Sequence, residues 1–195
     1  MSVAIEKTLL VAVLLVLPLG AGAAEETRIL RTQENVARFD PTACDGLPFA
    51  TNLRLGADAY SVEVRRRDGK VTNDTREDVG VASACGQITS ATFAPGTVHP
   101  FFIRFGLADG DYAALGSCTI ISNDVPQPWL VLAGCNLKIT SGPPGTIGGS
   151  LTSISVFNPL SLAGFFTGSF WTLHLYAEDA PARGHRGQEA EDHGR

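Results

Sequence analysis

Apolar and polar residues alternate along most of the chain, which is the pattern of β-strands with one buried face. The clearest case spans residues 100–139, where two turn signals, Asp109-Gly110 and Val125-Pro126-Gln127-Pro128, separate three alternating runs. Asp-Gly between apolar runs is a strong hairpin signal, and successive strand residues point to opposite faces. We therefore predict a three-stranded antiparallel meander with one apolar and one polar face.

The two turns also fix a register for this meander. With residues 109 and 110 as the first turn, Leu107 lies opposite Tyr112 and Phe101 lies opposite Cys118. With the second turn centred on residues 126 and 127, Cys118 lies directly opposite Cys135. A slip of one residue would move the apolar set to the other face. Both turns and the cysteine pair agree on one register, which predicts a disulfide between neighbouring strands.

The chain has four cysteines, and an even number in an exported protein predicts two disulfides. The register pairs Cys118 with Cys135, which leaves Cys44 and Cys85 as the second pair by elimination. The alternative is that both bonds join one sheet to another. No C-x-x-C spacing occurs, and no histidine lies within ten residues of a cysteine. We therefore predict neither a metal nor a cofactor.

The other alternating runs, at 51–56, 59–65, 81–93, 151–157 and 168–176, predict further short strands. Arg67-Asp68-Gly69-Lys70 predicts a hairpin turn, residues 73–80 and 141–150 predict loops, and residues 33–38 are the one helical candidate. About eight to ten short strands predict an all-β fold, either an antiparallel β-sandwich or a small closed β-barrel, with the sandwich favoured. An outer-membrane barrel is disfavoured because Arg104 and Lys138 interrupt the lipid-facing alternation.

The N-terminus has the pattern of a cleaved export signal. Lys7 precedes an uncharged run whose core, Leu9 to Leu19, is 11 residues long, and an Ala-x-Ala pattern follows at 21–23. A span of the bilayer needs about 20 residues; an uncleaved anchor is the alternative. We predict a signal peptide at 1–23, one all-β domain at 24–176 and a disordered polar tail at 177–195. The location is then secreted, periplasmic or cell-surface.

Charge and motifs exclude more functions than they indicate. The net charge of −5 is unsuited to nucleic acid, which requires a basic surface. No G-x-S-x-G motif occurs, and no catalytic residue is predicted. His99 precedes a predicted strand, and His174 lies on the outward face of the last predicted strand, where a lone histidine is interpreted as solvated. Asn73-Asp74-Thr75 matches an N-glycosylation acceptor.

The most unusual segment is FNPLSLAGFFTGSF at 157–170, which is apolar and carries no charge. Its large side chains belong either to the core of a strand pair or to an apolar loop at the rim of a pocket or association surface. The candidate ligand-binding residues are Trp129, Leu160, Phe165, Phe166 and Trp171.

These observations favour a secreted or cell-surface module without catalytic activity that binds a ligand or partner, such as a glycan, a lipid or a protein. Two alternatives remain open. One is a lipocalin-like carrier with a continuous internal cavity for an apolar molecule. The other is a secreted hydrolase, which would need two carboxylates, or a serine with His99 or His174, in one cleft.

Overall fold

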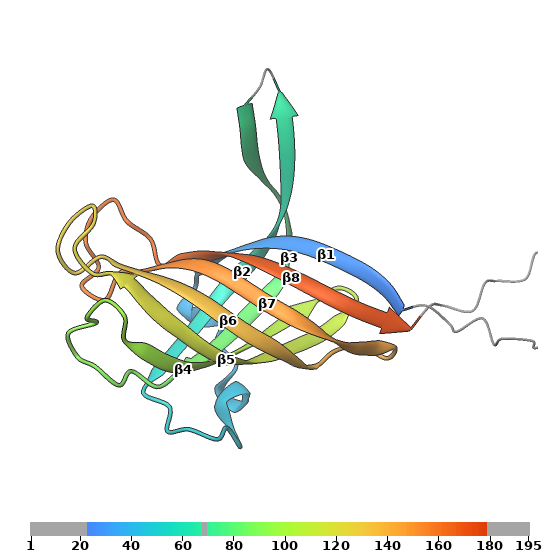
Figure 1. Ribbon diagram of the computed structural model, residues 1–195, viewed down its shortest axis with the longest axis horizontal. Helices are drawn as coiled ribbons and strands as arrows, with labels where there is room; N and C mark the ends of the chain where they lie inside the picture. The colour runs from blue at the N-terminus through green and yellow to red at the C-terminus, as the bar shows by residue number, and fades with distance from the viewer. Residues whose placement is uncertain (1–22, 68–69, 179–195) are drawn as a thin grey trace, which may run out of the picture.

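The computed structural model describes residues 23–67 and 70–178. Its eight antiparallel strands form one sheet, in which each strand pairs with the next and β8 pairs with β1, so that the sheet closes into a barrel (Figure 1). The strands are β1 (Ala23–Glu34), β2 (Leu53–Arg67), β3 (Lys70–Gly86), β4 (Val98–Leu107), β5 (Gly110–Ser122), β6 (Val131–Ser141), β7 (Thr146–Phe157) and β8 (Gly168–Glu178).

The all-β fold with two disulfides is as predicted, but the preference for a sandwich was wrong. The strand that closes the barrel is β1, which pairs with β8 from Ala23↔Glu178 to Gln33↔Gly168. The sequence did not predict this strand, because the residues flanking Leu30 on its inner face are Arg28 and Thr32, and no apolar alternation results. The helical candidate at 33–38 is the end of β1 followed by the short 3-10 helix η1 (Val36–Arg38).

The register predicted for β5 and β6 is confirmed, with Cys118↔Cys135 and Gly116↔Leu137. The register predicted for β4 and β5 was wrong by two residues, since Leu107 pairs with Gly110 and Phe101 with Gly116. The turn is formed by residues 108 and 109 instead of 109 and 110. Because the shift is even, every side chain keeps its predicted face.

Two predicted loops are largely strand. Residues 73–80 belong to β3, which pairs with β2 as far as Arg67↔Lys70 and forms an arm that projects from the barrel (Figure 1). Residues 146–150 belong to β7. Both segments lack a clear apolar alternation, and backbone pairing with a neighbouring strand extends them. The predicted turn residues Asp68 and Gly69 and the side chain of Asn73 lie outside the residues that the structure describes, as do residues 1–22 of the predicted signal and residues 179–195 of the predicted tail. Ala177 and Glu178, predicted as the start of the tail, belong to β8 instead, because they continue its pairing with β1.

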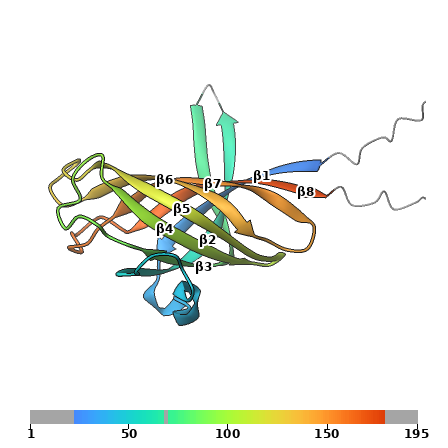
Figure 2. The same cartoon turned by 60° about the horizontal axis from the view of Figure 1, so that its bottom comes forward.

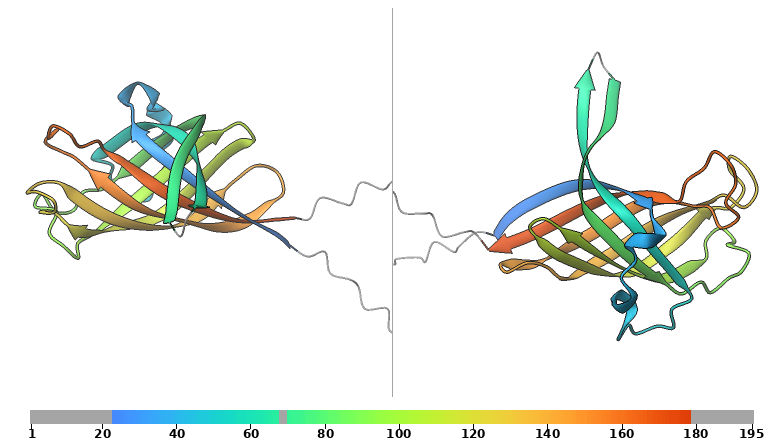
Figure 3. Two further views of the ribbon diagram at one scale, coloured as in Figure 1. Left: turned by 90° about the horizontal axis from the view of Figure 1, so that it is seen from above. Right: turned by 180° about the vertical axis from the view of Figure 1, so that it is seen from behind.

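The alternation of chain direction gives the barrel two different ends. The connections 87–97, 123–130 and 158–167 gather at the end opposite the two termini, and we call this the loop end (Figures 1 and 2). The connection 35–52, which includes the second 3-10 helix η2 (Pro41–Cys44), lies against the outer wall (Figure 3). There Cys44 is disulfide-bonded to Cys85 of β3, and Asp40 forms an ion pair with Arg104 of β4. No helix in the described ranges is long and apolar enough to cross a membrane.

Candidate functional site

An apolar cavity of about 80 Å³ lies inside the barrel at the loop end. Strand residues form most of its wall, and the connection 87–97 contributes Ile88 and Phe93. No carboxylate, lysine or arginine of the described residues lines it, and its polar groups are hydroxyls and one imidazole. The wall includes Leu53, Phe93, Phe101, Ile120, Val131 and Phe157.

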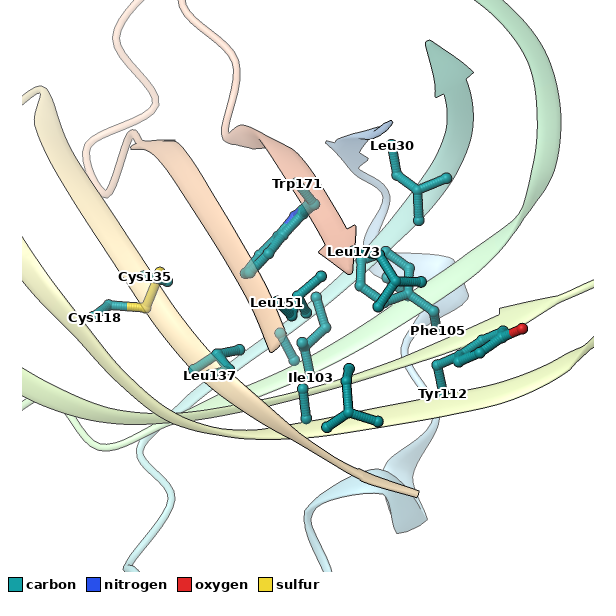
Figure 4. Packing of buried hydrophobic residues seen from close by; sticks show 14 of the residues in the cluster. Leu30, Ile103, Phe105, Tyr112, Cys118, Cys135, Leu137, Leu151, Trp171 and Leu173 are labelled. Carbon is teal, nitrogen blue, oxygen red and sulfur yellow. A yellow bond between two sulfur atoms is a disulfide. The ribbon is translucent and has the colours of Figure 1, made fainter. Parts of the chain in front are cut away.

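Aromatic side chains fill the barrel below this cavity, where Phe101 forms part of the cavity wall. Trp171 is 2% exposed, stacks on Phe101 with ring centroids 6.3 Å apart, and meets the edge of Phe105 at 6.0 Å. Its indole N–H donates to Thr32 Oγ1 at 3.1 Å, so its polar group is satisfied. Figure 4 shows Trp171, Phe105 and the leucines of β6 to β8 filling the barrel below. The cavity is therefore confined to the loop end and does not run through the barrel.

The Cys118–Cys135 disulfide forms part of the cavity wall. The two residues are directly opposite each other on β5 and β6, with Cα atoms 3.9 Å apart, and both side chains point into the barrel (Figure 4). A bond between adjacent strands fixes their separation at the point where β5 and β6 reach the loop end. Cys118 and Cys135 therefore have a structural role at the cavity.

His99, at the start of β4, anchors the connection 87–97 over the cavity. It is 3% exposed and therefore buried. Its Nδ1 accepts a hydrogen bond from the Thr89 backbone N–H at 3.1 Å, so the neutral ring carries its proton on Nε2. Its ring meets Phe93 edge-on at 6.2 Å, and Phe93 in turn contacts Phe157. Burial lowers the pKa of His99, and a hydrogen bond with the Gln87 backbone partly opposes this shift.

The lowered pKa predicts that the protein loses stability when the pH falls below about 6.5, the ordinary value for histidine. In that window the unfolded chain binds a proton at His99 and the folded chain does not, so acidification favours unfolding. His99→Asn keeps an acceptor for the Thr89 N–H but does not titrate, and is expected to flatten the pH dependence there. Urea titrations between pH 5 and 7.5 measure the free energy of unfolding of both proteins. If this free energy fell equally with pH in the two proteins, the pH dependence would not come from His99.

The opposite end of the barrel is closed by charged and polar groups. Arg28 pairs with Asp109 and Glu26, each at 2.6 Å, and lies over the ring of Tyr112. Tyr112 donates its hydroxyl to Asp109 at 2.8 Å. Burial, together with this hydrogen bond, raises the pKa of Tyr112 to about 12. These groups satisfy one another, and the hollow beside them between β1 and the arm, about 450 Å³, is wider and more open than the apolar cavity.

The five candidate ligand-binding residues are not brought together. Trp171 is buried in the barrel below the cavity, whereas Trp129, Leu160 and Phe166 are exposed on connections at the loop end. Phe165 is half-buried, and its carbonyl accepts a hydrogen bond from Asn158. None of the five lines the apolar cavity, although Trp171 lines a smaller space that adjoins it. Their role in binding stays a prediction.

The residues that do line the cavity include His99 and Phe93, which the sequence analysis did not select. Phe93 takes a left-handed φ of 47° just before Pro95-Gly96, and this turn brings its ring back over the barrel mouth. The turn is visible in the sequence, but the direction of its side chain depends on contacts with β4 and β7.

The two histidines of the described residues, His99 and His174, bond threonine side chains or backbone. The ring nitrogens of His99 lie within hydrogen-bonding distance of Thr89 and Thr97. His174 lies on the outer face of β8, where Nε2 is 3.2 Å from Glu25 and Nδ1 is 3.2 Å from the Thr27 hydroxyl. Within residues 23–67 and 70–178, no group of three His, Cys, Asp or Glu side chains is placed to hold a metal ion.

No protein-family model, curated protein or solved structure matches this chain. The function is therefore inferred from the geometry and chemistry of the cavity.

Proposed function

We propose that the protein is a secreted or cell-surface module without catalytic activity, which binds a small apolar ligand, or the apolar end of a larger one, at the loop end of its barrel. The observation that carries the proposal is the cavity of about 80 Å³ with an apolar wall. Water gains few hydrogen bonds in such a space, whereas an alkyl chain or single ring gains contacts on every side.

The size and polarity of the cavity narrow the ligand. Sites for drug-sized molecules measure roughly 300–1,000 Å³, so this one suits a group of a few carbon atoms. No charged side chain faces it, and His99 is held neutral by burial, which favours an uncharged ligand. The hydroxyls of Ser155 and Ser169, 2.7 Å apart, line one side and are able to bond a small polar group on the ligand.

Hexanol, a neutral alkyl chain with one hydroxyl, tests this proposal. A ligand that binds only the folded state raises its stability, so we expect hexanol to raise the melting temperature. Ala133→Leu places a larger side chain in the cavity and should remove the increase. Thr152→Leu adds the same side chain on the outer face of β7 and should leave it unchanged. Equal shifts in all three proteins, or no shift in the natural protein, would refute the proposal.

A further inference from the structure

Charged residues are nearly absent from the three connections of the loop end and the strand ends that carry them. The three connections and the adjoining strand ends comprise residues 87–100, 119–134 and 153–171, and Asp124 is their one charged residue. Charged residues make up 18% of the whole chain, so these segments are strongly depleted. The neighbouring strand β1 brings Arg31 and Glu34 close to the same end, where Arg31 lies over the Phe170 ring.

Large apolar side chains are exposed at the loop end. Trp129 on the connection 123–130 is 46% exposed, and Leu160 and Phe166 on the connection 158–167 are 57% and 71% exposed. Ile154 and Phe170, paired across β7 and β8, continue the exposed apolar surface onto the adjacent wall. We call Trp129, Leu160 and Phe166 the apolar tips. The connections that carry them lie at the same end in every view (Figures 1, 2 and 3).

We propose that the loop end docks on the surface of an electrically neutral lipid bilayer, with the apolar tips inserted at the boundary between headgroups and acyl chains. Exposed apolar patches mark protein or membrane contacts. A protein interface commonly has a polar rim with complementary charges that fix its orientation, and the connections of the loop end have almost no charge to supply them. Tryptophan is also favoured at the lipid boundary, where its ring meets apolar chains and its N–H stays hydrated.

The charge pattern also selects the kind of bilayer. Attraction to anionic lipids depends on clusters of lysine and arginine, and the three loop-end segments contain neither. Docking therefore rests on burial of apolar area, which salt does not screen. The apolar tips are not part of the cavity wall, so docking stands whether or not the cavity holds a ligand.

Vesicles of phosphatidylcholine, whose headgroup is zwitterionic, test the docking surface with the protein in its exported form. We expect the protein to co-sediment with the vesicles, and to do so equally when salt is raised to about 1 M, where the Debye length is roughly 3 Å. Tryptophan emission should shift to the blue, because Trp129 moves out of water while Trp171 is already buried.

Two variants distinguish docking through the apolar tips from nonspecific adsorption to vesicles. Leu160→Ser combined with Phe166→Ser removes two apolar tips without touching the core and should weaken co-sedimentation by about tenfold or more. Ile147→Ser, at the other end of β7, removes a side chain that is 60% exposed and should leave binding unchanged.

Three results would overturn the proposal. The first is no co-sedimentation with phosphatidylcholine, and the second is binding that appears only with anionic vesicles and disappears in salt. The third is a dimer in sedimentation velocity that the Leu160→Ser, Phe166→Ser protein loses, since the apolar tips would then join two copies of the chain. A failure of hexanol binding with intact vesicle binding would refute the cavity proposal alone.

Discussion

Replacing Trp171 with alanine is expected to lower the free energy of unfolding by about 3–5 kcal/mol, the usual cost of emptying a large aromatic site in a core. Trp171 is 2% exposed, and it contacts Phe101, Phe105 and, through its N–H, Thr32. The surrounding strands belong to a closed barrel, so they cannot easily move inward to fill the space. Alanine would therefore leave a hole below the cavity and remove the hydrogen bond that the Trp171 N–H donates to Thr32.

The second tryptophan provides the matched control. Trp129 is 46% exposed on a connection at the loop end, so Trp129→Ala is expected to change stability by no more than about 0.5 kcal/mol. Urea unfolding followed by circular dichroism measures both variants without relying on tryptophan emission. Similar losses for the two would mean that Trp171 is not part of the packed core below the cavity.

Much of the local fold could be predicted from the sequence. The pairing of β5 with β6 followed from a proline-rich turn and from Cys118 opposite Cys135, because each signal fixes the same register. The pairing of β4 with β5 was two residues out, yet the inner and outer faces were correct, since alternation depends only on parity. Short-range signals thus determine which side chains are buried more firmly than they determine which residues are opposite each other.

Closure of the barrel could not be predicted in the same way. It depends on the pairing of β1 with β8, in which Ala23 lies opposite Glu178. These two residues are at opposite ends of the described chain. The inner face of β1 carries Arg28, which pairs with Asp109 at one end of the barrel, and Thr32, which accepts the Trp171 N–H in the middle. Both partners are distant in sequence, so the local pattern of β1 does not indicate a strand.

The candidate cavity was missed for a related reason. The uncharged segment 157–170 pointed to the correct end of the molecule, but its exposed residues, Leu160 and Phe166, point away from the interior. The cavity wall is built from residues of the seven strands β2 to β8, from Ile88 and Phe93 on the connection 87–97, and from Thr167 on the connection 158–167. Only the closed sheet brings these positions together around one space.

Removing the Cys44–Cys85 disulfide, which joins the connection 35–52 to the barrel, should lower the free energy of unfolding about as much as Trp171→Ala. Cys44 and Cys85 are 41 residues apart in sequence, and a bond that closes a loop of this length stabilises by roughly 4 kcal/mol in the chain-entropy model. The separation of 17 residues between Cys118 and Cys135 gives roughly 3 kcal/mol by the same relation. We therefore expect Cys44→Ala combined with Cys85→Ala to lower the free energy of unfolding by roughly 4 kcal/mol in non-reducing urea titrations.

Arg104→Gln is the control for this prediction, because it removes a non-covalent contact of the same connection. Its ion pair with Asp40 is about one-third exposed on both sides, and such a pair contributes no more than about 1 kcal/mol. The Asp40 N–H donates to Ser83 Oγ at 2.9 Å, and neither variant removes this hydrogen bond, so the connection keeps this contact with the wall. If Arg104→Gln cost as much as the double cysteine variant, the connection would be held chiefly by its polar contacts. Equal losses would contradict the prediction that the disulfide is the stronger of the two contacts.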